Sequence, residues 1–421
     1  MPSALLIAAF DSQLKWAALV GDQLQERGFT CTYAAPSDDR SALSQDQCAA
    51  VGVGRVHRLD HATLVDLAAA ADVVVLALVG PRVRDFCEAV SAPGTRRNGG
   101  TAGPVIVTGW VGVVIEKITA GYLDRCLADV VAVNAAHELE HFRDVAQQLG
   151  IDPGNLLLSG LPLLSPSPAP QRSGPVRTVV YADQPTVPAT AVDRLYVYRR
   201  LLAHARLHPD RHVVLKPRHQ VHEDTFHQMA HHPEELLAHE ALPANFTISY
   251  RTVPDLLAEA DLLVTVSSTA CLEAIDRGCR VALVLDLGVH ERLGNQVFLD
   301  SGLLRTFDQI DHDDLGDPDP RWVDSWFTGS TSTPAELIVD RVEKLLATGE
   351  RPSRAVRDST YQRAAREVDQ ARRAEPGPPR AWTLRRQRHG AVKGTAIQWA
   401  LWWTPPVVQR PVRRWWTARE R

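Results

Sequence analysis

Residues 260–278 read ADLLVTVSSTACLEAIDRG and predict an apolar strand that runs straight into a helix. Ser267, Ser268 and Thr269 stand at the junction, and Gly278 ends the helix. Small hydroxyl residues at such a junction can cap the helix. Together with the first N–H groups of the helix, they can also receive a phosphate. Both interpretations fit this stretch when it is taken alone.

The same alternation of strand and helix extends through most of the 421 residues. Wholly apolar strands separated by helices are typical of parallel sheets that helices cover on both faces. In the first half, strands are predicted at Ala4–Ala9, Thr30–Ala34, Val73–Val79, Val105–Thr108 and Val130–Val133. In the second half, they are predicted at Thr178–Ala182, His212–Lys216, Phe246–Ser249, Leu262–Val266 and Val281–Leu285. We therefore expect an α/β protein with two Rossmann-like domains.

A Pro/Ser-rich stretch, SPSPAPQRSGP at residues 165–175, is the predicted linker between the two domains. It separates an N-terminal domain, residues 1–164, from a C-terminal domain, residues 176–330. Further C-terminal helices are predicted within residues 331–374, and a tail rich in Trp and basic residues follows at 375–421.

Composition excludes several classes of protein. The six cysteines form no C-x-x-C pair, which favours reduced thiols and a cytoplasmic setting. No apolar run is long enough for a transmembrane helix. No Walker A loop and no G-x-G-x-x-G follow the first strand, so an ATPase and a standard dinucleotide enzyme are disfavoured. No His, Cys or acidic cluster has convincing metal-ligand spacing, and we expect neither a metal nor a cofactor.

A basic cluster follows a predicted strand of the second domain in HVVLKPRHQ, residues 212–220. Lys216, Arg218 and His219 would lie at the carboxyl end of that strand, where open α/β sheets bind ligands. A solvated basic loop would have the same composition. Because the Ser-Ser-Thr junction belongs to the same domain, we favour a shared phosphate site for the two segments.

Two segments of the first domain could supply an acid or base. Asp11 and Ser12 directly follow the first strand, where they either cap a helix or face the predicted cleft. Gly109 and Trp110 follow a later strand, and glycine there would let the backbone approach a ligand closely. Together with Ser12 and Lys117, these residues are expected on the acceptor side of the cleft. Glu116 comes next along the chain and is either a first-turn helix acid or a general base.

In this order, the segments resemble a superfamily of GT-B glycosyltransferases. The similarity is to CDP-glycerol glycerophosphotransferases, to bacterial CMP-sialic acid polysialyltransferases and to an actinobacterial glycosyltransferase group, over roughly residues 1–300. The first two families have a D-x-x-x-[ST]-S segment before a helix that carries a Glu. Asp261, Ser267, Ser268 and Glu273 fill that pattern here, with Asp261 spaced slightly differently. The resemblance implies that the serines hold the donor phosphate and that Glu273 contacts the nucleotide or its ribose.

The basic segment of these families reads K-x-H-P or R-P-H-P, whereas this chain has K-P-R-H. Lys216 and Arg218 match it, and His219 is displaced by one residue. Glycerophosphotransferases also carry a W-H-G loop whose His is the proposed base. Here the loop is Gly109-Trp110-Val111-Gly112 without a His, although Lys117 matches a downstream Lys. The departure favours sugar transfer with an acidic base, for which Asp11 and Glu116 are the candidates.

The resemblance therefore implies a metal-independent, inverting glycosyltransferase of polysaccharide biosynthesis that uses a CMP- or CDP-linked sugar and a glycan or lipid-linked acceptor. The alternatives are a polyol-phosphate transferase of the CDP-glycerol type, a sugar-nucleotide epimerase or hydrolase, and a degenerate nucleotide-sugar binding protein. No nucleic-acid partner is expected.

The C-terminal tail bears on where the enzyme would work. From Arg380 onward it holds ten Lys or Arg residues, one acidic residue and six Trp. Such a segment suits a peripheral contact with the inner face of the plasma membrane. The alternative is a terminal helix that packs on the enzyme.

Overall fold

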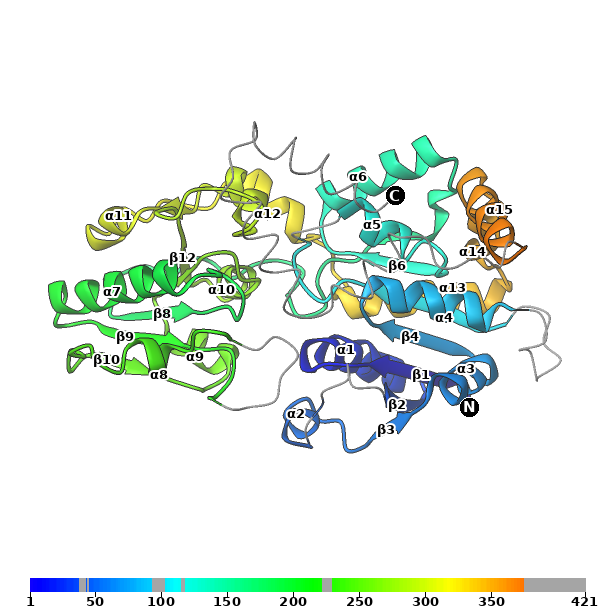
Figure 1. Ribbon diagram of the computed structural model, residues 1–421, viewed down its shortest axis with the longest axis horizontal. Helices are drawn as coiled ribbons and strands as arrows, with labels where there is room; N and C mark the ends of the chain where they lie inside the picture. Colours follow the sequence, from blue (N-terminus) through cyan, green and yellow to red (C-terminus); the bar gives the residue numbers. More distant parts are fainter. Residues whose placement is uncertain (38–42, 44, 93–102, 115–117, 222–228, 375–421) are drawn as a thin grey trace, which may run out of the picture. The chain divides into compact units, whose positions relative to one another are not determined.

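The computed structural model describes residues 1–37, 43, 45–92, 103–114, 118–221 and 229–374. All contacts reported below lie within one compact unit, residues 1–362. This unit contains two separate β-sheets, each built only from parallel strands and flanked by helices (Figure 1).

The first sheet has seven strands in the order β3-β2-β1-β4-β5-β6-β7. They are β1 (Ser3–Ala8), β2 (Thr30–Pro36), β3 (Val56–Leu59), β4 (Val73–Ala77), β5 (Val105–Gly109), β6 (Val130–Val133) and β7 (Leu156–Leu158). The helices between them are α1 (Asp11–Glu26), α2 (Gln45–Ala50), α3 (His61–Ala70), α4 (Gly80–Val90), α5 (Ile118–Leu123) and α6 (Ala136–Leu149), with a 3₁₀ turn at Pro153–Asn155.

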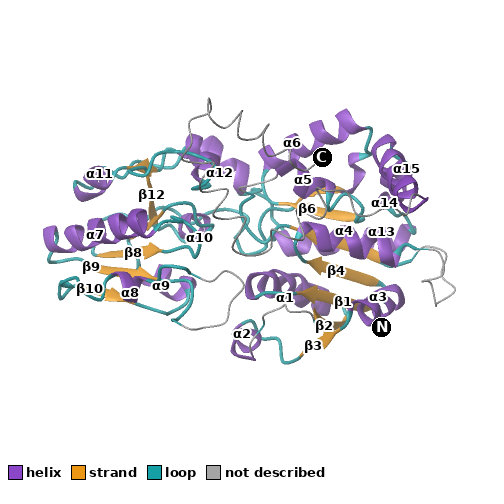
Figure 2. Ribbon diagram, viewed as in Figure 1, coloured by secondary structure: helices purple, strands orange, loops and turns teal. Residues whose placement is uncertain are grey.

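The second sheet has six strands in the order β10-β9-β8-β11-β12-β13. They are β8 (Thr178–Ala182), β9 (His212–Lys216), β10 (Phe246–Ile248), β11 (Leu262–Thr265), β12 (Arg280–Val284) and β13 (Leu304–Arg305). Its helices are α7 (Ala191–Leu207), α8 (Pro233–Leu236), α9 (Val253–Glu259), α10 (Ala270–Asp276), α11 (Phe307–Asp311) and α12 (Pro320–Trp326), with a 3₁₀ segment at Asn295–Ser301. Figure 2 shows α7 running along the sheet that contains β8 and β9.

Both sheets have a topological switch point. In the first sheet β1 pairs with β2 on one side and with β4 on the other, and in the second sheet β8 pairs with β9 and β11 in the same way. The connections from these central strands therefore leave in opposite directions. A crevice opens at the carboxyl ends of the strands at such a point, and open α/β sheets bind ligands there.

Burial on both faces explains why the strands read as continuous apolar runs. Along β1, Leu5 and Ile7 join one hydrophobic core, whereas Ala4, Leu6 and Ala8 join the core on the opposite face. All five side chains are almost completely buried. A strand inside a doubly covered sheet has no face on which a polar side chain could meet water.

Helix α13 (Pro334–Thr348) follows the second sheet in the sequence but packs on the first. Ile338 and Val342 lie in the same core as the residues of β1, and Arg27 of the first sheet's connections binds Asp340 (2.7 Å) and Glu343 (2.5 Å). A capping box between Thr333 and Glu336 defines its start. Two further helices follow, α14 (Pro352–Arg357) and α15 (Thr360–Ala374).

The predicted fold class, two parallel α/β sheets followed by C-terminal helices, is confirmed. The helix predicted at Pro334–Thr348 is found with those bounds. Strands β3, β7 and β13 were not predicted; they have two to four residues, and none of their residues is fully buried. The domain boundaries stay predictions, and the basic tail from residue 375 lies outside the described residues. No described helix has the length and hydropathy needed to span a membrane.

The linker predicted at 165–175 contains no helix or strand and lies against the second sheet's connections. The Ala169 N–H donates to the Asp276 carbonyl (3.0 Å), and the Arg172 N–H donates to the Gly278 carbonyl (2.7 Å). Gly278 has a positive φ of 69°. A Cβ atom there would stand 2.2 Å from the Pro170 carbonyl oxygen, so the close approach of the linker requires glycine.

Replacing Gly278 by Ala should therefore destabilise the protein more than the same change at Gly288. Gly288 also has a positive φ, but nothing lies within 4 Å of an added Cβ atom there. We expect Gly288→Ala to cost about 1 kcal/mol through backbone strain, and Gly278→Ala to cost a further ~1–3 kcal/mol through overlap with the linker backbone. Denaturant titration of both variants measures the difference. Equal losses would contradict this packing of the linker.

Candidate functional site

Asp11 begins α1 at the switch point of the first sheet. The helix N-cap is Phe10, which makes no side-chain cap, so the interpretation of Asp11 or Ser12 as the cap is wrong. The Ala9 N–H instead donates to the side chain of Gln13 (3.0 Å). The Asp11 carboxylate, which is partly exposed, is thus left to accept a hydrogen bond from the Arg218 guanidinium.

The basic segment after β9 separates into one outward and two inward side chains. Arg218 is exposed and reaches Asp11. Lys216 is buried, and its ammonium donates to the Pro217 carbonyl (2.6 Å). His219 is also buried, with Nδ1 at 2.8 Å from the Gln220 carbonyl and Nε2 accepting from the Met229 N–H (3.1 Å). Because backbone atoms occupy both ring nitrogens, His219 does not offer the phosphate contact expected from the sequence.

The three hydroxyl residues after β11 have different surroundings. Ser267 is fully buried, and its hydroxyl donates to the Leu293 carbonyl (2.5 Å). The Ser268 hydroxyl is partly exposed and accepts from the Ala270 N–H (3.2 Å). The Thr269 hydroxyl accepts from the Val113 N–H of the first half (3.2 Å). The expectation that all three hydroxyls face a ligand is therefore wrong for Ser267, and Ser268 is the most available of the three.

The helix that follows these hydroxyls is short. Helix α10 has only seven residues, and its N-cap Thr269 makes no side-chain cap. The aligned peptide dipoles of so few residues add little positive potential. An anion at this junction would therefore have to be bound by side chains and by individual backbone N–H groups.

The loop after β5 approaches the second half rather than an open space. A Cβ atom on Gly112 would stand 2.8 Å from the Thr269 hydroxyl oxygen, and one on Gly109 would overlap Trp16 and Ala132. Both glycines therefore permit close packing within the protein, not the close approach of a ligand that the sequence suggested. Glu116 and Lys117 lie outside the described residues.

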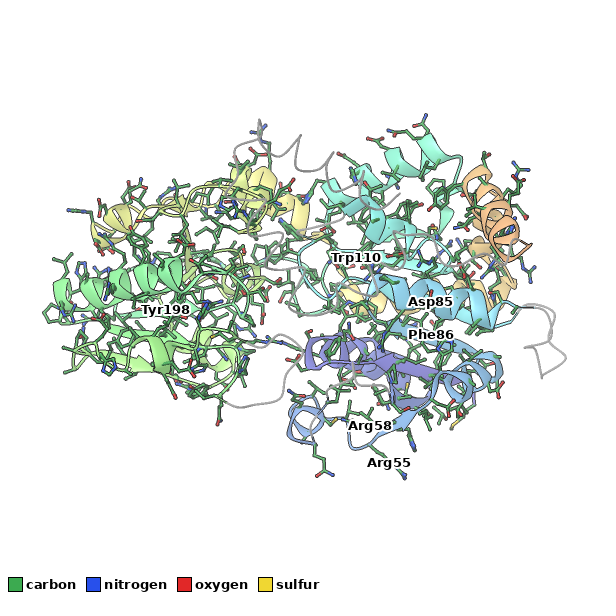
Figure 3. The ribbon with its side chains drawn as sticks, in the orientation of Figure 1. Arg55, Arg58, Asp85, Phe86, Trp110 and Tyr198 are labelled. Carbon is green, nitrogen blue, oxygen red and sulfur yellow. The ribbon has the colours of Figure 1, made fainter. Side chains whose placement is uncertain are left out.

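Trp110 forms the buried base of this loop (Figure 3). Its ring stacks on Phe142 with a centroid distance of 4.9 Å, and the Arg125 guanidinium lies 4.6 Å from the ring centroid on the Trp110 face. Trp110 is therefore a packing residue in this structure rather than the acceptor-side contact that the sequence suggested.

Arg125 fixes the carboxyl edge of the first sheet. Its three nitrogens donate to the carbonyls of Gly109 (3.0 Å), Gly121 (3.0 Å) and Leu78 (3.3 Å). Burial lowers its pKa to about 10, although the nearby Asp124 opposes the shift. The strand ends at β4 and β5 are thus held by one guanidinium.

Two further residues from the resembling pattern are placed by the structure. Glu273 on α10 lies 3.9 Å from the Lys15 ammonium on α1, which adds a second charge pair between the halves. Asp261 stands at the other end of β11, where its carboxylate accepts from the N–H groups of Arg177 (2.8 Å) and Thr178 (2.9 Å). Asp261 is therefore structural, whereas Glu273 is close to the segment that carries Ser268.

Sequence reasoning missed Glu138, the third residue of α6, which follows β6 at the same sheet edge. The side chain is 3% exposed, and neither carboxylate oxygen makes a hydrogen bond of ordinary geometry. Burial raises its pKa to about 7, and the backbone amides of Val114, Asn134 and Ala135 oppose the rise. The Asn134 amide donates to the Gly112 carbonyl (2.9 Å). In the sequence Glu138 resembles an ordinary first-turn helix acid, and nothing in the sequence indicates that its carboxylate is buried without a hydrogen-bond partner.

Within the described ranges, His204, His208 and Asp311 are the residues that could together hold a metal ion. The Asp311 carboxylate is already paired with His204 Nδ1 (2.7 Å) and with the Arg200 guanidinium (3.0 Å). The group lies where α7 ends and the chain enters the amino end of β9, away from Arg218. It is therefore not part of the arrangement at the carboxyl edges.

The described residues also line a small apolar pocket of about 120 Å³ between the linker and the second sheet's connections. Pro168, Ala169 and Val281 are among its lining residues. An apolar lining offers no group for a phosphate, so the pocket is separate from the candidate site.

Two parallel doubly wound sheets with polar residues at both switch points define the class of GT-B-like α/β proteins, and solved structures agree. The chain matches UGT89C1 of Arabidopsis thaliana in complex with UDP, with a TM-score of 0.54 and 10% identity, covering 83% of this chain and 100% of that one. It also matches a putative UDP-N-acetylglucosamine 2-epimerase from Listeria monocytogenes, with a TM-score of 0.52 and 11% identity, covering 82% and 96%.

A family model gives the more specific assignment. It matches residues 4–345 and is described as "Putative glycosyltransferase (DUF6716)", so the chain belongs to this family. No curated protein matches the sequence. The resemblance to glycerophosphotransferases and polysialyltransferases stays a prediction.

The isolated carboxyl group of Glu138 should make folding stability depend on pH. Its folded pKa of about 7 lies above the ordinary value of 4.5. The stabilisation is therefore full below about pH 4.5 and is lost as the pH rises through 7, by about 3 kcal/mol in total. Because Gln mimics the neutral group, Glu138→Gln should stabilise the protein more at pH 8 than at pH 5. Calorimetry at both pH values tests this, and an equal effect at both would refute the assignment.

Proposed function

We propose that the protein is a glycosyltransferase that takes a sugar from a nucleotide-activated donor, with Asp11 and Arg218 beside the reacting atoms. The observation that carries the proposal is the ion pair between these two residues. They are 207 positions apart in the sequence, and the sequence indicates them for different reasons: Asp11 as an acid or base and Arg218 as a phosphate contact.

A guanidinium paired with a carboxylate marks a place that suits a phosphate. Arginine binds carboxylate and phosphate through the same planar fork of N–H donors. Both Arg218 and Asp11 are nearly half exposed, so a donor phosphate could replace the carboxylate without opening a core. Asp11 would then be released next to the bound donor.

Support for a nucleotide-sugar donor comes from two directions. The family is described as one of glycosyltransferases, and the similar Arabidopsis protein was solved with UDP. The motif resemblance favours CMP or CDP as the carrier instead. The carrier is therefore best identified by a panel of nucleotides.

In the proposed reaction the Asp11 carboxylate removes the proton from an acceptor hydroxyl. The acceptor oxygen attacks the anomeric carbon from the face opposite the phosphate, and the bond between that carbon and the phosphate oxygen breaks. Inversion follows from this geometry. The leaving nucleotide carries away the electron pair as a phosphate anion. The Arg218 guanidinium and the Ser268 hydroxyl would contact this anion, and the buried Lys216 ammonium would stabilise it through its charge. Fixed cations of this kind would do the work of a divalent metal.

The acceptor is proposed from the sequence alone. A glycan or lipid-linked acceptor would suit a basic, Trp-rich tail that touches an anionic leaflet, but this tail is outside the described residues. Donor breakdown without any acceptor would favour an epimerase or hydrolase. Transfer of a polyol phosphate would favour the CDP-glycerol type of reaction, and binding without turnover would favour a degenerate binding protein.

Removing the Arg218 guanidinium should weaken nucleotide binding. A hydrogen bond to a charged group contributes ~1.5–3 kcal/mol, so we expect Arg218→Ala to raise the Kd by about ten- to a hundredfold. Calorimetric titration with UDP, TDP, CDP, CMP and GDP would select the ligand and measure the change. Arg251→Ala is the matched control, because Arg251 is also a half-exposed arginine paired with a carboxylate, Glu259. If the wild-type protein binds none of these nucleotides, the proposed function is wrong.

Asp11→Asn should change binding and turnover in opposite directions. Without the competing carboxylate, the nucleotide should bind about two- to fivefold more tightly, as expected for loss of an exposed ion pair. Turnover of the donor should fall by about 10²–10⁴, the usual contribution of a general base. Asp85→Asn, an exposed carboxylate of the same half (Figure 3), is the control. Unchanged turnover would remove Asp11 from the mechanism.

A further inference from the structure

A completely buried arginine lies beneath the first loop of the second sheet. Arg194 on α7 is 1% exposed, and its Nη1 donates to both oxygens of Asp183 (3.0 and 3.1 Å). The Tyr198 hydroxyl (Figure 3) donates to the same carboxylate (2.5 Å). Burial raises the pKa of the Asp183 carboxyl to about 6, and the Arg194 guanidinium opposes the rise. Asp183 directly follows β8, the central strand at the switch point.

A buried ion pair of this kind contributes little to the free energy of unfolding by itself. Desolvating two charges offsets most of their attraction, and apolar side chains of similar volume often stabilise a core as well. The remaining donors of Arg194 show what the pair holds in place. Its Nη2 donates to the carbonyl of Gln184 (2.5 Å) and to that of Pro185 (2.7 Å). The guanidinium therefore fixes the backbone of the loop after β8.

The fixed loop reaches the neighbouring strand through one side chain. Gln184 Oε1 accepts from the Ser267 N–H (3.0 Å), and Gln184 Nε2 lies 3.3 Å from the Ser267 hydroxyl oxygen. The Ser267 hydroxyl in turn donates to the Leu293 carbonyl. The loops after β8, β11 and β12 are thus connected by consecutive hydrogen bonds that begin at Arg194.

The same contacts decide where the backbone donors point. The peptide between Pro185 and Thr186 is trans, so its N–H points opposite to its carbonyl. Because the Pro185 carbonyl faces Arg194, the Thr186 N–H faces away from the core. Thr186 is exposed. Within the described residues, the N–H groups of Thr186, Ser268 and Thr269 have no hydrogen-bond acceptor. These three donors flank the switch point.

We propose that Arg194 is a positioning residue for donor binding. Held by Asp183 and Tyr198, it orients the Thr186 N–H, and through Gln184 it fixes the turn at Ser267. Backbone N–H groups on both sides of the switch point then bind the donor's phosphate groups. This inference rests on the proposed function and adds the loop after β8 to the phosphate site, which the sequence pattern confined to Lys216, Arg218 and the Ser-Ser-Thr junction.

The test compares two conservative substitutions in the same half. Arg194→Lys keeps the charge but cannot reach both carbonyls and the carboxylate, because an ammonium lacks the planar fork. Arg211→Lys is the matched control. Arg211 is also buried and bidentate to a carboxylate, that of Asp313 (2.9 and 2.6 Å), but it precedes the amino end of β9. Both changes should lower the melting temperature.

The expected result is a split in nucleotide affinity. Arg194→Lys should raise the Kd for the nucleoside diphosphate that the wild-type protein selects by at least about tenfold, and Arg211→Lys should leave it unchanged. In turnover, Arg194→Lys should raise the donor KM more than it lowers kcat. Tyr198→Phe should raise the Kd in the same direction by a smaller factor, and it replaces Arg194→Lys if that variant does not fold.

The outcomes separate this inference from the function on which it rests. If the wild-type protein binds a nucleotide and neither Arg194→Lys nor Tyr198→Phe changes the Kd, the positioning role is overturned while the proposed function stands. If both arginine variants weaken binding equally, the effect is general destabilisation and the inference is also overturned. If the wild-type protein binds no nucleotide, the proposed function fails, and this inference fails with it.

Discussion

Parallel pairing is the constraint on which the rest of this structure depends. In a purely parallel sheet, every strand ends at the same edge, and every return connection crosses a face of the sheet, usually as a helix. The residue that directly follows each strand is therefore brought to one edge, whatever its distance in the sequence. This is how Asp11 after β1 and Gln184 after β8 come to the switch points of their sheets. The same constraint buries both faces of each strand, which leaves the strand ends as the places where polar side chains can gather.

At those ends, some polar side chains form hydrogen bonds within the protein, and others stay accessible to a ligand. A buried polar atom without a hydrogen-bond partner is costly in free energy. A residue that lies slightly inside the edge therefore forms hydrogen bonds with backbone groups. His219 and Ser267 show this outcome, since carbonyl or N–H groups take all their polar atoms. Arg218 and Ser268, one residue away from each of them, stay accessible. Residue type alone does not separate the two groups, because neighbouring side chains in an irregular segment can point in opposite directions, one into the protein and the next toward solvent.

This difference explains what could be predicted from the sequence. Strands such as Thr178–Ala182 and the helix Pro334–Thr348 were predicted correctly, because apolar continuity and capping residues act locally. The sequence indicated Asp11 and Arg218 as separate candidates, but it did not predict that they contact each other, because this contact depends on how the two sheets are packed. Glu138 and Arg194 were missed altogether. Each sits in an amphipathic helix where an acid or a base is unremarkable, and only complete burial distinguishes it. Burial of a single charged residue depends on tertiary packing, and no spacing of residues in the sequence predicts it.

The two halves hold their sheet edges by the same chemical means. In the first, Arg125 donates to the carbonyls of Gly109, Gly121 and Leu78. In the second, Arg194 donates to those of Gln184 and Pro185. A loop at a switch point lacks the ladder that holds a strand, and its inward carbonyls need donors from beneath. Guanidinium suits this position because five N–H groups in one plane can serve several carbonyls at once. The difference lies in the counter-charge: Asp183 neutralises Arg194 directly, whereas Arg125 lies over an aromatic face, that of Trp110, and its nitrogens donate to backbone oxygens. The first half thus balances its buried guanidinium with the Trp110 ring and with the nearby Asp124, which opposes the lowering of the Arg125 pKa.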